Sequence, residues 1–289
     1  MKMEQGQNKP DEIFSCTRIA EFQNYLHQEE RSRNTITKYI RDLKVFFTFL
    51  DGQPMDKEAL LDWKKHLTQT HAPASVNSML AALNQFLEFC GYGQMKVRRV
   101  KTQKNLFRQE EKELTAKEYR RLVRAARSAG KIQLALIMEA IAVTGVRVSE
   151  LRYFTVEQVK RGRIEVRNKG KYRRIFLTTD IRKKLLCFAK FRKIIKGCVF
   201  VTNSGKPKDR SNLWSEMKAL KEKAGVKGEK IFPHNLRHLF ARVYYQTTKD
   251  MAGLADVLGH SSLNVTRIYT SSTGEIYQRQ LERLTILQI

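Results

Sequence analysis

The chain has 289 residues and carries 55 Lys and Arg against 29 Asp and Glu, which gives a formal net charge of +26. A chain of this length can form two domains, because single hydrophobic cores rarely grow beyond about 250–300 residues. The charge is not typical of a metabolic enzyme and indicates a polyanionic partner, with nucleic acid favoured over an acidic membrane surface. We find no window of about 18 apolar residues and no signal-peptide core, so we predict a cytoplasmic protein that does not span a membrane.

Residues 13–95 are predicted to form an all-helical domain of about four helices. Apolar residues recur at helical spacing in three runs, at 19–50, 57–67 and 75–89. Polar residues from Ser32 onward can cap a helix that ends near residue 50, and Gly91 and Gly93 can end the last one.

Residues 96–112 are predicted to be a basic linker, because they follow neither helical nor strand periodicity and hold seven basic residues against two acidic ones. Such a linker can lie along a phosphate backbone. The alternative is a solvated loop whose charge only aids solubility. The residues proposed for phosphate contact are Arg98, Arg99, Lys101 and Lys104.

Residues 113–289 are predicted to form a second, mostly helical domain with a small β component. Thr115 and Glu118 have the spacing of a capping box. Apolar helical segments follow at 122–126 and 132–143, and helices are expected again from residue 213, ending in a helical tail. Short β segments are predicted at 164–167, 174–178 and 199–202, with a turn at Asn168–Gly170 between the first two.

The run from Thr144 to Leu151 places an arginine at the start of a helix. Gly145 can supply a sharp turn, and Arg147 then lies in or near the first turn, where its guanidinium can bind a phosphate that the helix N-terminus also attracts. The alternative is an arginine that only pairs with Glu150.

The run from His234 to His238 follows Pro233, a residue favoured in the first turn of a helix. His234 and Arg237 share a helix face, and His238 lies near it, so a proton acceptor and a phosphate ligand converge. A metal site is disfavoured, because the Glu of a His-Glu-x-x-His motif is absent and no third ligand is suggested. We therefore predict no bound metal.

A basic hairpin and a late tyrosine complete the candidate site. Residues 160–174 hold eight cationic side chains and one acid, and their hairpin can enter a DNA groove. Its proposed contact residues are Lys169 beside the turn glycine, and Lys171, Arg173 and Arg174. Tyr269 follows His260 by nine residues, whereas Tyr244, Tyr245 and Tyr277 are interpreted as packing residues.

The order and content of these motifs closely resemble the tyrosine recombinase or phage integrase family, in particular its compact Xer-like members. Five motifs stand in family order within about residues 17–275: Thr-Gly-x-Arg-x-x-Glu-Leu, a hairpin Lys-Gly, His-x-Leu-Arg-His, Leu-Gly-His and Thr-x-x-Tyr-Thr. The resemblance implies a SAM-like core-binding domain at 13–95 and a mixed α/β, mostly helical catalytic domain at 113–289.

The resemblance also implies a site-specific DNA recombinase. Tyr269 would attack the scissile phosphate and form a 3′-phosphotyrosine bond, while Arg147 and Arg237 would hold the non-bridging oxygens. No metal or other cofactor is expected, because cationic side chains supply the positive charge and transesterification stores the cleaved bond.

Supporting roles follow from the same resemblance. His234 would accept the tyrosine proton, Lys169 would protonate the 5′-oxygen, and His260 would hydrogen-bond the phosphate. Glu150 would orient neighbouring groups, and His238 would support them.

Two positions depart from the family pattern. Asn168 stands where glycine is common, and Phe176 stands where many relatives have proline. Both can alter the hairpin, so Lys171 is the substitute for Lys169 as general acid.

The expected partners are double-stranded DNA with specific core sites and further copies of the chain. A monomer off DNA would assemble into a tetramer on two duplexes, and DNA-bending proteins could assist. The terminal segment would pack on its own domain or dock on a neighbour. Three alternatives stay open: a mobile-element integrase or a chromosome-dimer resolvase, an inactive DNA-binding protein, and a topoisomerase-like enzyme.

Overall fold

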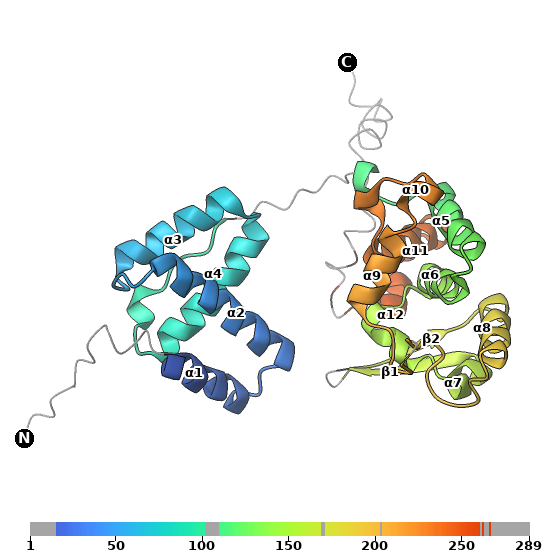
Figure 1. The fold of residues 1–289 in the computed structure, drawn as a ribbon, viewed down its shortest axis with the longest axis horizontal. Helices are drawn as coiled ribbons and strands as arrows, with labels where there is room; N and C mark the ends of the chain where they lie inside the picture. The colour runs from blue at the N-terminus through green and yellow to red at the C-terminus, as the bar shows by residue number, and fades with distance from the viewer. Residues whose placement is uncertain are drawn as a thin grey trace, which may run out of the picture. The chain divides into compact units, whose positions relative to one another are not determined.

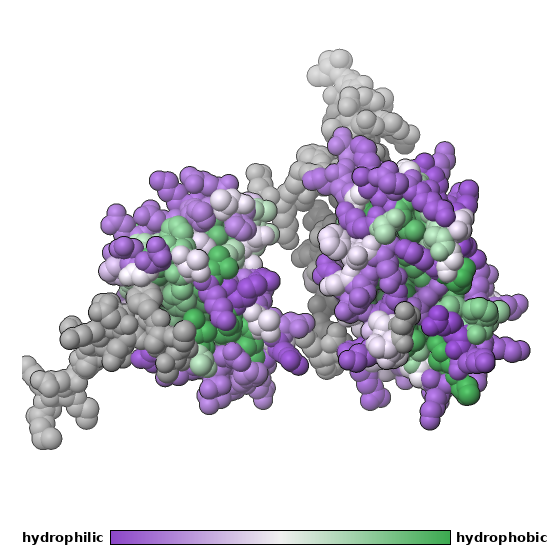
Figure 2. Space-filling view, viewed as in Figure 1, coloured by the Kyte–Doolittle hydropathy of each residue, from purple (hydrophilic) through white to green (hydrophobic). Residues whose placement is uncertain are grey.

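The computed structural model describes residues 16–101, 110–168, 171–202, 204–260, 262 and 266. The chain divides into two compact units, Met1–Lys104 and Asn105–Ile289 (Figure 1). Much of the visible surface of each unit is hydrophilic (Figure 2), in keeping with the net charge of +26. Within the described ranges, we find no helix with the length and apolar character needed to cross a membrane.

The first unit is all-helical, as predicted. Its core contains an aromatic cluster. The ring centroids of Phe22 and Phe86 lie 5.3 Å apart in an edge-to-face arrangement, and those of Phe46 and Trp63 lie 5.7 Å apart. Ser32 caps the second helix by accepting a hydrogen bond from the Thr35 amide. The helix α4 packs against the other three. The helices are α1 (Cys16–Gln28), α2 (Arg33–Leu50), α3 (Lys57–Thr70) and α4 (Pro73–Phe89).

The residues after α4 remain attached to it, beyond the short 3-10 helix η2 (Gly93–Met95). The Asn84 side chain donates to the Val97 carbonyl at 2.9 Å and accepts from the Val97 amide at 2.8 Å. Asn77 makes the same pair of bonds to Val100. The start of the predicted linker therefore belongs to the first unit. Arg98, Arg99 and Lys101 are exposed there, and Lys104 lies outside the described residues.

The second unit is built around one helix, α6, whose side chains are buried on all sides. A helix that is hydrophobic all round needs neighbours on every face, and α6 packs against α5, α8, α9 and α11. The mainly α class with a small β component is confirmed. The elements are η3 (Glu110–Lys112), α5 (Ala116–Ser128), α6 (Ile132–Thr144), η4 (Val148–Tyr153), α7 (Val156–Arg161), β1 (Arg163–Asn168), β2 (Lys171–Phe176), α8 (Thr179–Phe191), α9 (Arg210–Lys218), α10 (Lys221–Ala224), η5 (Gly228–Lys230), α11 (Pro233–Thr248) and α12 (Met251–Leu258).

The strands β1 and β2 form an antiparallel hairpin, as predicted, with Asn168 opposite Lys171. The predicted strand at 199–202 is wrong, because among the described residues this stretch makes only the isolated bridge of Val201 with Pro207. Val199 and Phe200 are buried in the core. Their apolar run therefore reflects burial of a loop, and a short buried run cannot be distinguished from a strand by periodicity.

The capping box predicted at the start of α5 is confirmed by the bonds between Thr115 and Glu118. At the end of α6 the chain turns sharply at Gly145, which has a φ of 64°. A Cβ there would lie 2.5 Å from the Phe240 ring and 2.8 Å from a Leu258 methyl. Only glycine lets these elements approach so closely.

Gly145→Ala should destabilise the second unit more than Gly130→Ala. Gly130 also has a positive φ, but a Cβ there meets nothing within 4 Å, so its substitution bears only the cost of the left-handed backbone, about 1–2 kcal/mol. Overpacking should make the Gly145 variant less stable by a further ~1–3 kcal/mol. The measurement is urea unfolding followed by Trp214 fluorescence in a Trp63→Phe background. Equal losses in the two variants would contradict the packing argument.

Candidate active site

Arg147 lies at the start of η4, directly after the Gly145 turn. Its amide donates to Glu150 Oε2 at 2.8 Å, and its guanidinium donates to Glu150 Oε1 at 3.2 Å. The pairing with Glu150 is therefore present, but 39% of the Arg147 side chain stays exposed while Glu150 is 3% exposed. Glu150 thus holds Arg147 in place, while the exposed part of the guanidinium can bind an external anion. The helix that follows is a 3-10 helix.

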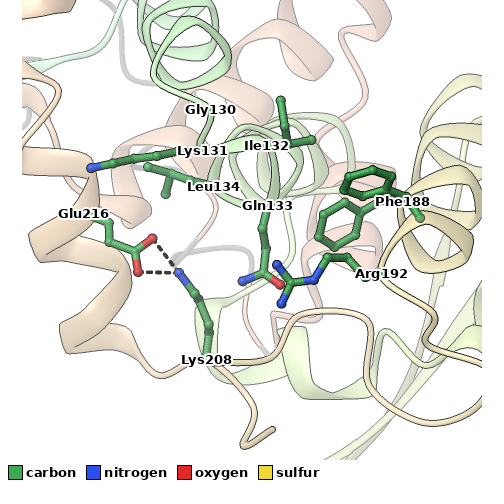
Figure 3. Close-up of a pocket in the computed structure, with 10 residues that line it drawn as sticks. Gly130, Lys131, Ile132, Gln133, Leu134, Phe188, Arg192, Lys208 and Glu216 are labelled. Carbon is green, nitrogen blue, oxygen red and sulfur yellow. Dashed lines mark hydrogen bonds and ion pairs between the residues drawn. The ribbon is translucent and has the colours of Figure 1, made fainter. Parts of the chain in front are cut away.

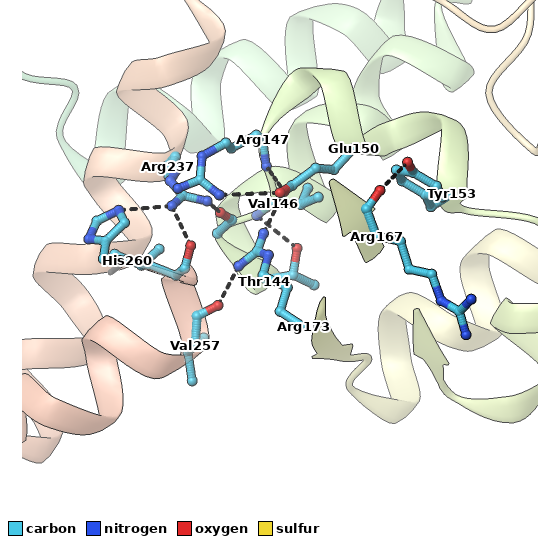
Figure 4. A network of polar contacts seen from close by, with 12 residues as sticks. Thr144, Val146, Arg147, Glu150, Tyr153, Arg167, Arg173, Arg237, Val257 and His260 are labelled. Atoms are coloured by element: carbon cyan, nitrogen blue, oxygen red, sulfur yellow. Dashed lines mark hydrogen bonds and ion pairs between the residues drawn. The ribbon is translucent and has the colours of Figure 1, made fainter. Parts of the chain in front are cut away.

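Arg237 lies one turn into α11, which begins at Pro233 as predicted. The residue is 1% exposed and donates to the carbonyls of Gly145 and of Leu258, the latter at 2.8 Å. Its Nη2 also lies 3.1 Å from His260 Nε2 (Figure 4). The first motif, the helix α11 and the end of α12 therefore converge on one guanidinium.

His260 follows Gly259, which ends α12 in a left-handed conformation. Its Nε2 faces an arginine, which can only donate, so Nε2 is the accepting nitrogen. Its Nδ1 then carries the proton and donates to Thr266 Oγ1 at 2.9 Å. Thr266 is fully buried and was not anticipated as a partner. The tautomer of His260 follows from these two neighbours.

His234 and His238 lie on successive turns of α11, with ring centroids 4.5 Å apart and planes at 84°. Desolvation and the positive charge of Arg237 lower the pKa of His234. Desolvation is also the main cause that lowers the pKa of His238 and of His260 to about 4. All three imidazoles are therefore neutral at neutral pH, and a neutral imidazole can accept a proton.

Arg173 does not lie where the sequence suggested. Its side chain is 11% exposed, forms an ion pair with Glu150 at 2.5 Å and donates to the Val257 carbonyl. It stands opposite Val166 on the buried face of the hairpin. The structure therefore gives the predicted DNA contact of Arg173 no support, because the side chain faces the interior of the unit. Strand alternation with buried Ile175 was the signal that could have revealed this.

Of the remaining predicted site residues in this unit, the side chain of Arg174 is described and those of three others are not. Arg174 points outward, 51% exposed, and donates to the Tyr172 hydroxyl at 3.1 Å. Lys169 and Tyr269 lie outside the described residues, and so does the Lys171 side chain.

Arg210, at the start of α9, helps to lower the pKa of His234 and was not predicted from the sequence. The capping residue Asp209 before it marks another helix start, the pattern that singled out Arg147.

Comparison with protein families assigns both units. The model described as "Phage integrase family" matches residues 112–275, and "Phage integrase, N-terminal SAM-like domain" matches residues 19–90. The chain belongs to the phage integrase family. The resemblance to tyrosine recombinases drawn from the motifs is thereby confirmed.

Known tyrosine recombinases are similar over nearly the whole chain. Tyrosine recombinase XerA of Pyrococcus furiosus is 30% identical over 280 residues, which cover 93% of this chain and 94% of the relative. XerH site-specific recombinase bound to difH substrate has a TM-score of 0.72 at 17% identity, covering 96% of this chain and 98% of that one. A lambda integrase tetramer bound to a Holliday junction has a TM-score of 0.70 at 20% identity, covering 91% and 81%. The last two similarities concern the fold.

In this tyrosine recombinase a pocket of about 1200 Å³ is lined by some of the converging residues. Arg147, Glu150, Arg173 and His260 contribute to its wall. A second pocket, of about 400 Å³, lies at the start of α6, where Lys208 and Glu216 form an ion pair (Figure 3). None of the predicted site residues lines it. The two pockets mark opposite ends of α6, about 20 Å apart along a 13-residue helix.

The described residues include no cluster of three or more His, Cys, Asp or Glu side chains suited to a metal ion. Among the described residues, the cations that line the pocket are arginines, which are permanently charged. This arrangement can bind an anion at Arg147 and place a neutral imidazole beside that anion.

Lowering the pH from about 7 to about 4 should reduce the free energy of unfolding. The unfolded chain protonates its histidines near pH 6.5, whereas the folded pKa of His238 and of His260 is about 4. The stability present above pH 6.5 is therefore lost as the pH falls through this window. His238→Asn should make the loss smaller by on the order of 1–3 kcal/mol in urea titrations. His71→Asn, at an exposed histidine of the first unit, is the control; identical pH slopes in both variants would refute the assignment.

Proposed function

We propose that this protein cuts and rejoins double-stranded DNA at specific core sites by metal-independent transesterification through Tyr269. The observation that carries the proposal is the convergence of Arg147, Arg237 and His260 from three separate segments, beside neutral His234. Arg147 and neutral His260 in the pocket wall, with buried Arg237 in contact with His260, suit a phosphodiester. DNA as substrate is supported by the relatives solved with difH substrate and with a Holliday junction.

In the proposed reaction the Tyr269 oxygen attacks phosphorus and forms a P–O bond, while the bond from phosphorus to the 5′-oxygen breaks. A phenol has a pKa of about 10, so its proton must be taken up during attack. His234 is the proposed acceptor, because its pKa is lowered and it is neutral. Lys169 returns a proton to the 5′-oxygen. Reversal by another 5′-hydroxyl rejoins the strand, so no energy cofactor is consumed.

The two arginines divide the work on the phosphate. Arg147 has 39% of its side chain exposed, and it is proposed to bind the non-bridging oxygens and neutralise the charge that develops on them. Arg237 is buried and donates to two carbonyls. Its positive charge is proposed to stabilise the phosphate from the interior of the unit. His260 is proposed to donate a hydrogen bond to the phosphate from Nε2, which requires that Nε2 exchange its contact with Arg237 for a proton while Nδ1 accepts from the Thr266 hydroxyl.

The proposed DNA-contacting set consists of basic residues, of which Arg98, Arg99, Lys101 and Arg174 are exposed. It comprises Arg98, Arg99, Lys101 and Lys104 after α4, with Lys171 and Arg174 on the hairpin. Contacts of this kind set affinity and its salt dependence, and they do not select sequence. A synaptic tetramer formed from monomers is part of the proposal, supported by the similarity to the lambda integrase tetramer, and so is assistance from DNA-bending proteins.

A suicide substrate tests the nucleophile. On a nicked duplex that contains the true site, the wild-type protein should form a covalent protein–DNA adduct that survives denaturing electrophoresis, and Tyr269→Phe should form none. Tyr277→Phe is the matched control and should retain the adduct. An adduct in Tyr269→Phe would move the nucleophile elsewhere. Specific binding without any wild-type adduct would favour the inactive DNA-binding alternative, and relaxation without exchange would favour the topoisomerase-like one.

The division between the arginines predicts different failures for their alanine variants. Arg147→Ala should reduce the cleavage rate about 10²–10³-fold at nearly unchanged thermal stability, because Arg173 still pairs with Glu150. Arg237→Ala should lose activity and also stability, since each buried acceptor left unsatisfied costs about 1–3 kcal/mol. Single-turnover cleavage and thermal unfolding of both variants measure this. Equal stability losses in the two variants would contradict this division of roles.

A further inference from the structure

We infer that Arg173 is a positioning residue of the active site, which acts through Glu150 to keep Arg147 available to the phosphate and through the end of α12 to hold His260. The inference rests on the proposed function. It concerns an arginine that the motifs of the sequence did not single out for chemistry and that lies on the buried face of the hairpin (Figure 4).

The Glu150 carboxylate is shared by two arginines. Its Oε1 accepts from the Arg147 guanidinium at 3.2 Å, and its Oε2 accepts from the Arg147 amide at 2.8 Å and from Arg173 Nη2 at 2.5 Å. With 3% of its side chain exposed, this carboxylate must be balanced by nearby cations. Among the described residues, those cations are Arg147 and Arg173.

The Glu150 cluster carries a net positive charge. Two guanidinium groups and one carboxylate leave one net positive charge in the cluster. Arg173 is 11% exposed and Arg147 is 39% exposed, so the unbalanced charge faces the pocket on Arg147. Without Arg173, the carboxylate and Arg147 would form a neutral pair, and Arg147 would have to break that pair to bind a phosphate.

Arg173 also holds the loop that carries His260. Its Nη1 donates to the Val257 carbonyl, near the end of α12. A Cβ at Gly259 would lie 2.5 Å from Arg173 Cδ, so the arginine stem packs directly on that glycine. His260 is the next residue. The hairpin strand β2 thereby ties the start of η4 to the end of α12.

A lysine cannot replace this arrangement. The planar guanidinium reaches a carboxylate with one nitrogen and a carbonyl with another, whereas an ammonium is a single point charge. Arg173→Lys keeps the charge but loses one of the two anchors. Because a displacement of about 1 Å in an active site can reduce a rate on the order of 10²-fold, loss of an anchor should be visible in the chemical step.

The first test separates chemistry from DNA binding. Single-turnover cleavage of the nicked duplex, at saturating DNA, should slow about 10–10²-fold in Arg173→Lys, while DNA affinity stays within about twofold. Arg120→Lys makes the same substitution at an exposed arginine of α5 and is the matched control, which should cleave like the wild type. A rate equal to wild type in Arg173→Lys would overturn the inference.

The second test asks whether Arg173 acts through Glu150. Glu150→Gln keeps the size of the side chain and removes its charge, and it should slow cleavage about as much as Arg173→Lys. If both act on one network, the double variant should be little slower than either single variant, because coupled residues are not additive. A double variant whose loss is the product of the two single losses would overturn the coupling.

The third test needs no DNA. The ring signals of His260 in the NMR spectrum of the full-length free protein should shift in Arg173→Lys, whereas those of His71, an exposed residue of the first unit, should not. Unchanged His260 signals would overturn the role of Arg173 at that loop. If the wild-type protein forms no adduct through Tyr269, the proposed function fails, and the His260 signals still decide whether Arg173 holds this loop.

Discussion

The guanidinium of Arg237 is buried and donates to two backbone carbonyls, those of Gly145 and Leu258. These carbonyls lie at the C-terminal ends of α6 and α12, where the last carbonyls of a helix have no partner within the helix. Arg237 therefore satisfies two helix ends and contacts His260 from the same position. A buried cation is tolerated only when it is well hydrogen-bonded, so the burial of this charge and the geometry of the pocket depend on each other.

Around Arg237, the second unit combines arginines that stay charged with histidines that stay neutral. The arginines remain protonated at any physiological pH. The histidines beside them are held neutral, because burial and the arginine charges lower the pKa of His238 and of His260 to about 4 and lower that of His234 as well. Permanent cations beside neutral imidazoles suit phosphoryl transfer in which anion binding and proton transfer are performed by different residues.

The helix α11 is also fixed to the start of its unit. Asn235 donates to the Lys112 carbonyl at 2.9 Å, and Arg242 pairs with Glu113 and donates to the Leu114 carbonyl. The helix that carries His234 and Arg237 is thus anchored on the segment that enters the unit. Together with Arg173 on the hairpin, these contacts hold every described side chain of the site on a packed element, which suits a reaction that needs fixed geometry.

The sequence by itself determined the helical class, the hairpin, the capping box of α5, the helix starts that carry Arg147 and Arg237, and the family. These features are local, since they depend on periodicity, turn residues and motif spacing. Only the tertiary structure decided that Val199 and Phe200 form no strand, that Arg173 turns inward, and that Thr266 fixes the tautomer of His260. The reason is that the acceptors of a side chain lie far away in the chain: Arg237 meets Gly145 across 92 residues, and Arg173 meets Val257 across 84.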